Sequence, residues 1–212
     1  MDGRSLGASV IVVRRASDRA VTHAPGITTW HSFSSGAHYD ATNVRVGELV
    51  TCDAHLLAPG AGFSTHVHRG LEIVTCVLAG TLEHTDSLGG RATVRPGTAA
   101  HLSAGSGVEH AERNAGADEL RFVQLWLLGD VTAAPAYRIG SVDVPGVTFN
   151  VVSGPACLVA APFVHAFVAS GTAVVAGADL AAGGEARITD EAVDIAVAGE
   201  LLVCAMRRPI PA

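Results

Sequence analysis

Two short runs of this sequence carry side chains that bind metal ions, one from His66 to His68 and one from His110 to Glu112. In each run the two polar residues are two positions apart, so on a strand they point to the same face. Two such strands facing each other across a β-barrel would bring together three imidazole nitrogens and one carboxylate. This ligand set suits Fe, Mn, Ni, Cu or Zn and leaves coordination positions for a substrate or dioxygen. The spacing therefore predicts a metal-dependent β-barrel enzyme.

The segment from Val44 to Leu128 must position these two runs, and its pattern predicts a succession of strands. Arg45–His55 and Ile73–Leu78 are apolar runs rich in β-branched residues, and Leu120–Leu128 reads as a long buried strand. Glycine-rich turns separate such runs, and long amphipathic helical patterns are hard to find. The sequence therefore predicts an all-β fold of many short strands.

A linker over residues 129–145 divides the chain, and Val147–Arg207 supplies a second set of short strands. We expect an N-terminal metal-binding barrel over residues 1–130 and a C-terminal domain over residues 131–212. The second half contains no His-x-His and no His-x-Glu run, and His165 stands alone in it. The C-terminal domain is therefore expected to be a degenerate, metal-free barrel.

The composition argues against some classes of binding partner and indicates the cellular compartment that is expected. The formal net charge is -6 and all 14 cationic residues are arginine, which argues against direct nucleic-acid binding through a basic surface. The four cysteines are scattered without CxxC spacing, and residues 1–15 lack a secretory pattern, so a cytoplasmic protein with reduced thiols is expected. The apolar stretch Cys157–Ala182 is interrupted by Pro162 and other breakers, which favours paired strands over a membrane span.

Several runs resemble known family signatures. The patterns Gly60-x5-His66-x-His68 and Gly107-x2-His110-x3-Asn114 resemble the two motifs of the cupin superfamily. The stretch of residues 66–75 is similar to the His-Pro-His-Arg-Gly-Phe-Glu run of the pirin family, although Val67 replaces the proline and leaves φ less restricted. Further similarity to the same family lies in residues 31–40, 82–87 and 103–112 and in Gln124-Leu125-Trp126.

The resemblance covers most of residues 30–128 and implies a bicupin, that is, two β-barrel domains of the double-stranded β-helix (jelly-roll) type. It implies one metal ion, usually iron, in the N-terminal barrel; cobalt is a further option beside the metals named above. The family's four ligands correspond here to His66, His68, His110 and Glu112. Bacterial members include quercetinases, which open a flavonol ring with dioxygen and release carbon monoxide, and eukaryotic members are nuclear transcriptional co-regulators.

The leading hypothesis is a dioxygenase of the quercetin 2,3-dioxygenase type, acting on a small aromatic substrate and dioxygen. Glu112 is the candidate general base for the substrate's hydroxyl proton. The alternative is a metal-containing, redox-sensing co-regulator that acts through protein contacts. A third option, a sugar or small-acid isomerase on the same barrel, would require a polar and charged cavity.

Other polar residues are weaker candidates. Glu72 is expected to orient a histidine or to be structural, and His101 to pack in a strand or to touch substrate. His84 is expected to be a packing or surface residue. Four more histidines carry no partner motif and are assigned no role: His23, His31, His38 and His55.

Overall fold

The computed structural model describes residues 10–207, and its regular structure is almost entirely strand. The one helix among these residues is a single 3-10 turn, η1 (Ala16–Asp18). The all-β prediction is therefore confirmed. Within the described residues no helix is long and apolar enough to span a membrane.

The chain divides into two compact units. One consists of residues 19–144, and the described part of the other consists of residues 10–18 and 145–207. This division differs from the expected boundary near residue 130. The reason at the N-terminal end is strand pairing, because β1 (Val10–Arg14) pairs with β16 (Glu185–Thr189) of the second unit.

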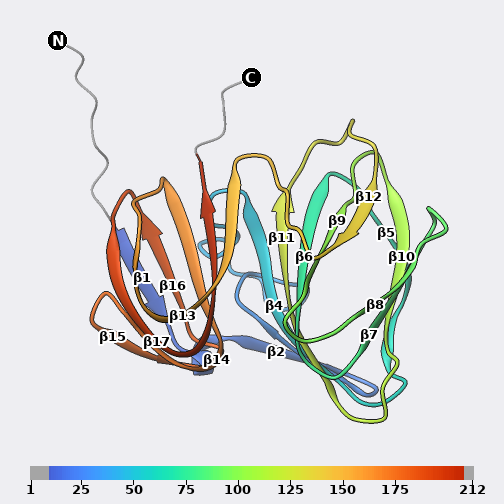
Figure 1. Cartoon of the computed structure of the whole chain (residues 1–212), viewed down its shortest axis with the longest axis horizontal. Coiled ribbons are helices and arrows are strands. Elements are labelled where there is room, and N and C mark those ends of the chain that lie inside the picture. Colours follow the sequence, from blue (N-terminus) through green and yellow to red (C-terminus); the bar gives the residue numbers. More distant parts are fainter. Residues whose placement is uncertain (1–9, 208–212) are drawn as a thin grey trace. The chain divides into compact units, whose positions relative to one another are not determined.

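The unit of residues 19–144 contains two antiparallel sheets (Figure 1). In spatial order the seven-stranded sheet consists of β12 (Ala136–Ile139), β9 (Ala99–Ser103), β6 (Leu71–Ala79), β11 (Leu120–Leu128), β4 (Leu49–Leu57), β3 (Ile27–His31) and β2 (Ala20–Ala24). The four-stranded sheet consists of β5 (Gly62–His68), β10 (Val108–Asn114), β7 (Leu82–Asp86) and β8 (Arg91–Val94).

The other unit contains one six-stranded antiparallel sheet. Its order is β1, β16, β14 (Phe163–Val175), β17 (Val193–Met206) and β13 (Val147–Leu158), with β15 (Ala178–Ala181) paired to β14. The apolar stretch Cys157–Ala182 thus forms paired strands, as expected. His165 on β14 is fully buried, and its Nε2 lies 3.1 Å from a carboxylate oxygen of Glu185.

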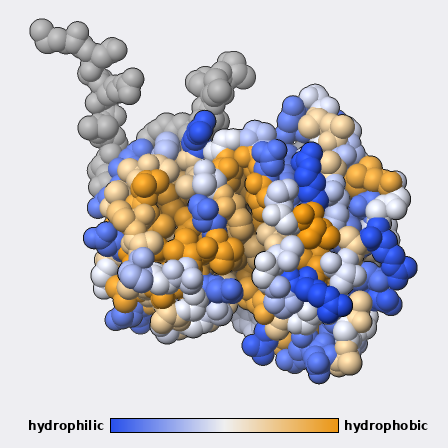
Figure 2. Space-filling view, viewed as in Figure 1, coloured by the Kyte–Doolittle hydropathy of each residue, from blue (hydrophilic) through white to orange (hydrophobic). Residues whose placement is uncertain are grey.

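Apolar side chains also remain exposed on the six-stranded sheet, and Figure 2 shows hydrophobic surface over this unit. Examples are Val12 on β1, Val151 on β13 and Val174 on β14. Single exposed valines are common on sheet surfaces and do not by themselves mark a binding site.

The strand boundaries follow the sequence closely where apolar runs are long. Leu120–Leu128 forms β11 as expected, and Ile73–Leu78 lies within β6. The first run begins later than expected, at Leu49, because Val46 and Leu49 hydrogen-bond to each other around Gly47, whose φ is 55°. A tight turn therefore replaces the first residues of the expected strand.

The strands β6 and β10 have different burial patterns. Six consecutive residues of β6, Glu72–Val77, are buried, as expected for a strand covered on both faces. On β10 buried and more exposed residues alternate, and its buried face carries Val108, His110, Glu112 and Asn114. Three polar residues on the buried face of one strand are costly unless they are paired, so this face is a candidate functional surface.

Candidate metal centre

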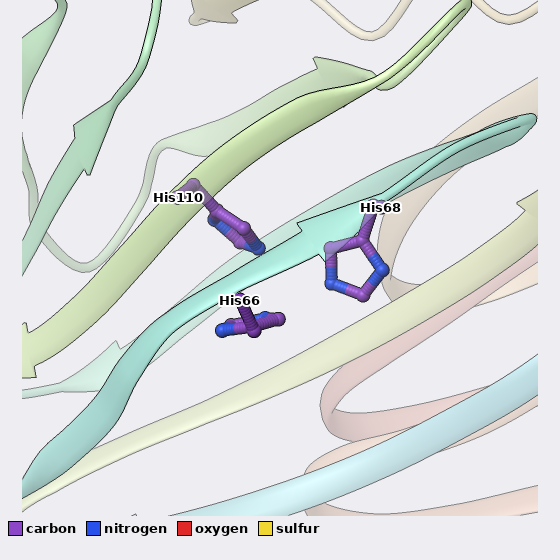
Figure 3. A group of neighbouring side chains, drawn as sticks. All are labelled: His66, His68 and His110. Atoms are coloured by element: carbon purple, nitrogen blue, oxygen red, sulfur yellow. The ribbon is translucent and has the colours of Figure 1, made fainter.

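Three predicted ligands meet where β5 and β10 pair. The antiparallel register places His110 directly opposite His66, while His68 lies opposite Val108. Figure 3 shows the rings of His66 and His68 from β5 and of His110 from β10 close together. The ring centroids are 4.4 Å apart for His66 and His110, 4.8 Å for His66 and His68, and 5.0 Å for His68 and His110. One nitrogen from each ring lies within 4.8 Å of the other two.

The hydrogen bonding of these rings leaves nitrogens available for an ion. His66 donates from Nδ1 to the backbone oxygen of Ser64 at 2.7 Å, so its Nε2 carries the free lone pair. Nε2 of His68 and both nitrogens of His110 are buried and have no hydrogen-bond partner within residues 10–207. Buried nitrogens without partners are destabilising, and coordination of a metal ion would satisfy them.

His68 and His110 are in the protonation state that binds metals. Burial, and then the neighbouring histidines, lower the pKa of His110 to about 3. Burial, with His66 as a second cause, lowers the pKa of His68 to about 4. Both imidazoles are therefore neutral at neutral pH, and a neutral ring offers a lone pair to a cation.

Glu112 lies in a second, overlapping group. Its carboxylate and nitrogens of His84 and His110 lie within 4.8 Å of one another. His110 belongs to both groups, but neither group of the described residues contains all four predicted ligands. The structure therefore brings His66, His68 and His110 together. Glu112 lies near His110 but is not in the same group as His66 and His68, so the four-ligand centre stays a prediction.

The Glu112 carboxylate is held by a short chain of side chains. The amide nitrogen of Gln124 donates to both Glu112 oxygens at 2.8 Å, and it also lies 3.2 Å from the hydroxyl of Thr75. The Trp126 indole donates to the Gln124 amide oxygen at 3.2 Å, which orients the amide. Burial raises the pKa of Glu112 to about 7, although the hydrogen bond from Gln124 opposes this shift.

His84 is a site residue for which no functional role is predicted from sequence. Its Nε2 pairs with Asp86 at 3.0 Å, and its ring stacks on Tyr137 at a centroid distance of 3.8 Å. It lies directly opposite Glu112 in the pairing of β7 with β10. A signal was present, because His84 and Asp86 have the same two-residue spacing as the two metal-binding runs.

A β-bulge shapes the first ligand strand. His66 pairs with His110, but Glu112 pairs with Phe63, so β5 has one more residue than β10 over this interval. Phe63 and His66 are three positions apart, yet both face the interior because of the bulge. The bulge also removes the Ser64 carbonyl from regular pairing, and this carbonyl accepts the His66 Nδ1 proton.

A cavity of about 520 Å³ adjoins the candidate centre. His66, Glu112 and Gln124 line it on the metal side, and Phe63 and Trp126 provide aromatic walls. A further wall is made by polar residues from β2, β3 and β4, namely Thr22, Thr29, His31, Asp53 and His55. The volume is within the range of pockets that bind small molecules.

The weaker candidates Glu72 and His101 bind each other instead. Their Oε2 and Nε2 atoms are 2.7 Å apart, and Ser103 donates to Glu72 at 3.0 Å. Glu72 is an odd number of positions from Thr75, the residue on β6 that contacts Gln124, so the two point to opposite faces of the strand. The structure therefore does not bring Glu72 and His101 to the histidine group.

The fold and the histidine group together define an all-β protein with a candidate transition-metal centre beside a cavity. The sequence profile of the pirin family matches residues 13–127. A Mycobacterium tuberculosis protein provisionally named quercetin 2,3-dioxygenase is 37% identical over 214 residues, covering 86% of this chain and 88% of that protein. The chain belongs to the pirin family, within the cupin superfamily.

Two matches from Escherichia coli, one of sequence and one of structure, extend the comparison. The one named quercetin 2,3-dioxygenase is 35% identical over 120 residues, covering 56% of this chain and 52% of its own length. The crystal structure of bacterial pirin YhhW in complex with nickel(II) superimposes with a TM-score of 0.83 at 25% identity, covering 94% of this chain and 100% of that one. The sequence-based recognition of the pirin family is therefore confirmed.

Proposed function

We propose that this protein is a metal-dependent dioxygenase that opens the ring of a flavonol such as quercetin, or of a related aromatic enol. The observation that carries the proposal is the convergence of three histidines, with unpartnered nitrogens on His68 and His110 among the described residues, beside a cavity that also contains Glu112. The names of relatives from Mycobacterium tuberculosis and Escherichia coli support the reaction class. The co-substrates are a small aromatic molecule and dioxygen.

His66, His68 and His110 would hold one divalent transition metal, with Glu112 as the fourth ligand. The donor set fits iron, and also Mn, Ni, Cu, Co or Zn; nickel(II) is the ion in the structure of the Escherichia coli relative. When bound, the ion supplies Lewis acidity and a template for a substrate oxygen. We place it in the unit of residues 19–144, and propose the other unit as the metal-free domain of a bicupin.

Glu112 has the properties of a general base for the substrate hydroxyl. In the metal-free protein burial raises the pKa of this carboxyl to about 7, and Glu112 would accept the substrate's proton on releasing the ion that it would coordinate. Glu112 and His66 both line the cavity, so the carboxylate would reach a hydroxyl bound close to the histidines. Gln124 restricts the carboxylate by donating to both of its oxygens, so the proton is received in a defined direction.

The cavity walls suit a flat aromatic ligand. Phe63 and Trp126 line it, and Trp126 also packs edge-on against His68 at a centroid distance of 4.7 Å. Aromatic side chains bind planar molecules through stacking and edge contacts and exclude water from the reacting centre. A ring held against Trp126 would therefore lie close to the histidine group.

The test combines metal analysis with oxygen uptake. Purified protein is depleted of metal, reloaded separately with Fe(II) and Ni(II), and assayed with quercetin for oxygen consumption and carbon monoxide release. Metal-dependent consumption of both substrates supports the proposal. A protein that retains one metal per chain but consumes no oxygen with any flavonol overturns it and leaves the co-regulator as the better account.

A further inference from the structure

The cavity contains a second hydrogen-bonded group, distinct from the histidines that would hold the metal. His31 Nδ1 lies 2.9 Å from a carboxylate oxygen of Asp53, and His31 Nε2 lies 2.9 Å from the hydroxyl of Thr22. All three side chains line the same cavity as His66 and Glu112. In this series of hydrogen bonds the Asp53 carboxylate holds one nitrogen of the imidazole. The Thr22 hydroxyl on the other nitrogen can be replaced by a group of a ligand.

Strand pairing places His31 and Asp53 in the same row of the sheet as Gln124, which hydrogen-bonds to Glu112. His31 on β3 is directly opposite Asp53 on β4, and Asp53 is directly opposite Gln124 on β11. Residues opposite each other on neighbouring strands point to the same face of the sheet. A single row across the sheet therefore carries His31, Asp53 and Gln124, and Gln124 binds Glu112.

The hydrogen bonds define what His31 offers to a ligand. An ionised carboxylate only accepts hydrogen bonds, so Nδ1 of His31 carries the proton that is donated to Asp53. In the neutral imidazole Nε2 is then the acceptor, and the Thr22 hydroxyl donates to it. His31 is 8% exposed whereas Thr22 is exposed, so the Thr22 contact is the replaceable one.

The surroundings favour a neutral hydroxyl group as the ligand. Next to this group His55 Nδ1 lies 2.9 Å from the Thr29 hydroxyl, and burial lowers the pKa of His55 to about 4. His55 is thus neutral near pH 7 and adds polarity but no positive charge. The Asp53 carboxylate would repel an anionic group, whereas a phenolic O–H can donate to Nε2 of His31.

We propose that His31, oriented by Asp53, is a specificity-determining residue that accepts a hydrogen bond from a phenolic hydroxyl remote from the reacting enol. This inference rests on the proposed dioxygenase function and narrows its substrate class to aromatic enols with a second, distant hydroxyl. The hydroxyl takes the place of Thr22 on Nε2, while Asp53 keeps the imidazole in the accepting tautomer.

The test compares two substrates in matched variants. Quercetin carries hydroxyls on both outer rings, whereas 3-hydroxyflavone has the reacting enol alone. His31→Leu removes the acceptor. His23→Leu is the control, because the exposed His23 lies on the adjacent strand with its Nδ1 3.2 Å from the Thr28 hydroxyl. Native protein and H23L should prefer quercetin, and in H31L the ratio of the two kcat/KM values should fall about tenfold.

The kinetic pattern separates substrate recognition from structural damage. Loss of the hydrogen bond should raise KM for quercetin and leave both constants for 3-hydroxyflavone unchanged. An equal loss for both substrates overturns the proposal. Asp53→Asn keeps the volume of the side chain and removes its charge, so it should shift the ratio in the same direction by less, and it decides the matter if H31L does not fold.

A binding measurement keeps this test separate from that of the proposed function. If the metal-loaded protein consumes neither compound, the dissociation constants of both are measured by quenching of tryptophan fluorescence. Tighter binding of quercetin that is reduced about tenfold in D53N or H31L supports the His31 subsite even without turnover. Equal affinities for the two compounds in native protein overturn it.

Discussion

Gln124 donates its amide to both oxygens of Glu112 at 2.8 Å and accepts the indole proton of Trp126 at 3.2 Å. Gln124 and Trp126 are two positions apart on β11 and therefore share a face of the strand. This relationship gives a physical meaning to the Gln-Leu-Trp run. The indole fixes the orientation of the amide, and the amide fixes the carboxylate.

The first prediction concerns this amide. Gln124→Leu removes the hydrogen bond that opposes the burial effect on Glu112, so the pKa of Glu112 should rise above about 7. Because a metal binds the ionised carboxylate, the pH at which metal affinity reaches half its maximum should rise by about one unit. Thr75→Val, which removes only the 3.2 Å contact to Gln124, is the control and should leave this midpoint nearly unchanged.

The second prediction concerns Glu112 as a base. Glu112→Gln at saturating metal should lower kcat for quercetin by about 10²–10⁴-fold, because the proton acceptor is lost. Folding should be little affected, since glutamine has the same size and hydrogen-bonds to Gln124. A variant that retains its metal and turns over at the native rate would show that Glu112 is not the base.

The third prediction uses the same variant without metal, where the raised pKa of Glu112 has a stability consequence. The folded-state pKa of about 7 lies above the ordinary value of 4.5, so the folded state holds a proton that the unfolded state releases between these values. This contribution is complete below pH 4.5 and is lost as the pH rises through 7. Relative to E112Q, the native protein should lose up to about 3 kcal/mol between pH 5 and pH 8.

Urea unfolding of both metal-free proteins at the two pH values provides the measurement. Metal addition at pH 8 should stabilise the native protein more than E112Q, because the ionised carboxylate then gains a cation. If the difference in unfolding free energy between native protein and E112Q is the same at pH 5 and pH 8, the burial argument for Glu112 is wrong.

The fourth prediction distinguishes the two overlapping ligand groups. If His66, His68 and His110 hold the ion, His66→Leu should weaken metal binding by at least about 100-fold, and His84→Leu should have a much smaller effect, within the range of a supporting residue. Metal content after dialysis against a chelator measures both. His38→Ala, on the exposed surface, is the control. Loss of metal in H84L with retention in H66L would assign the ion to the group of His84, His110 and Glu112.

The fifth prediction tests the close approach of β5 to β10. A Cβ atom on Gly62 would lie 2.3 Å from the backbone oxygen of Glu112, so Gly62→Ala must push the strands apart. We expect a loss of about 1–3 kcal/mol in unfolding free energy and weaker metal binding. At Gly116 the nearest atom would be 3.4 Å away, so Gly116→Ala should change neither quantity appreciably.

Part of the fold and of the site could be predicted from sequence because the relevant signals are local. The apolar run Leu120–Leu128 has the bounds of β11, and the two-residue spacing of His66 and His68 places both rings on one face. The division of the chain could not be predicted, because β1 pairs with β16, far away in sequence. Nor could the pairing of Glu72 with His101, which depends on the register of β6 with β9.

The residues missed by sequence reasoning share a physical reason. His31, His55 and His84 lie on separate strands, and each acquires its partner through sheet register or a two-residue contact that is unremarkable in isolation. A lone histidine in a strand gives no indication of whether it faces a cavity or solvent. Burial and pairing supply that information, and both are properties of the folded sheet.

The bulge on β5 has a consequence for how this protein tolerates change. The group that holds the Nδ1 proton of His66 is a main-chain oxygen, that of Ser64, so exchanging the Ser64 or Thr65 side chain leaves it in place. Removing one residue between Phe63 and His66 would instead abolish the bulge and change the position of that oxygen relative to the imidazole. The number of residues between Phe63 and His66 therefore determines which nitrogen of His66 carries the proton, and a scan of point substitutions would not detect this dependence.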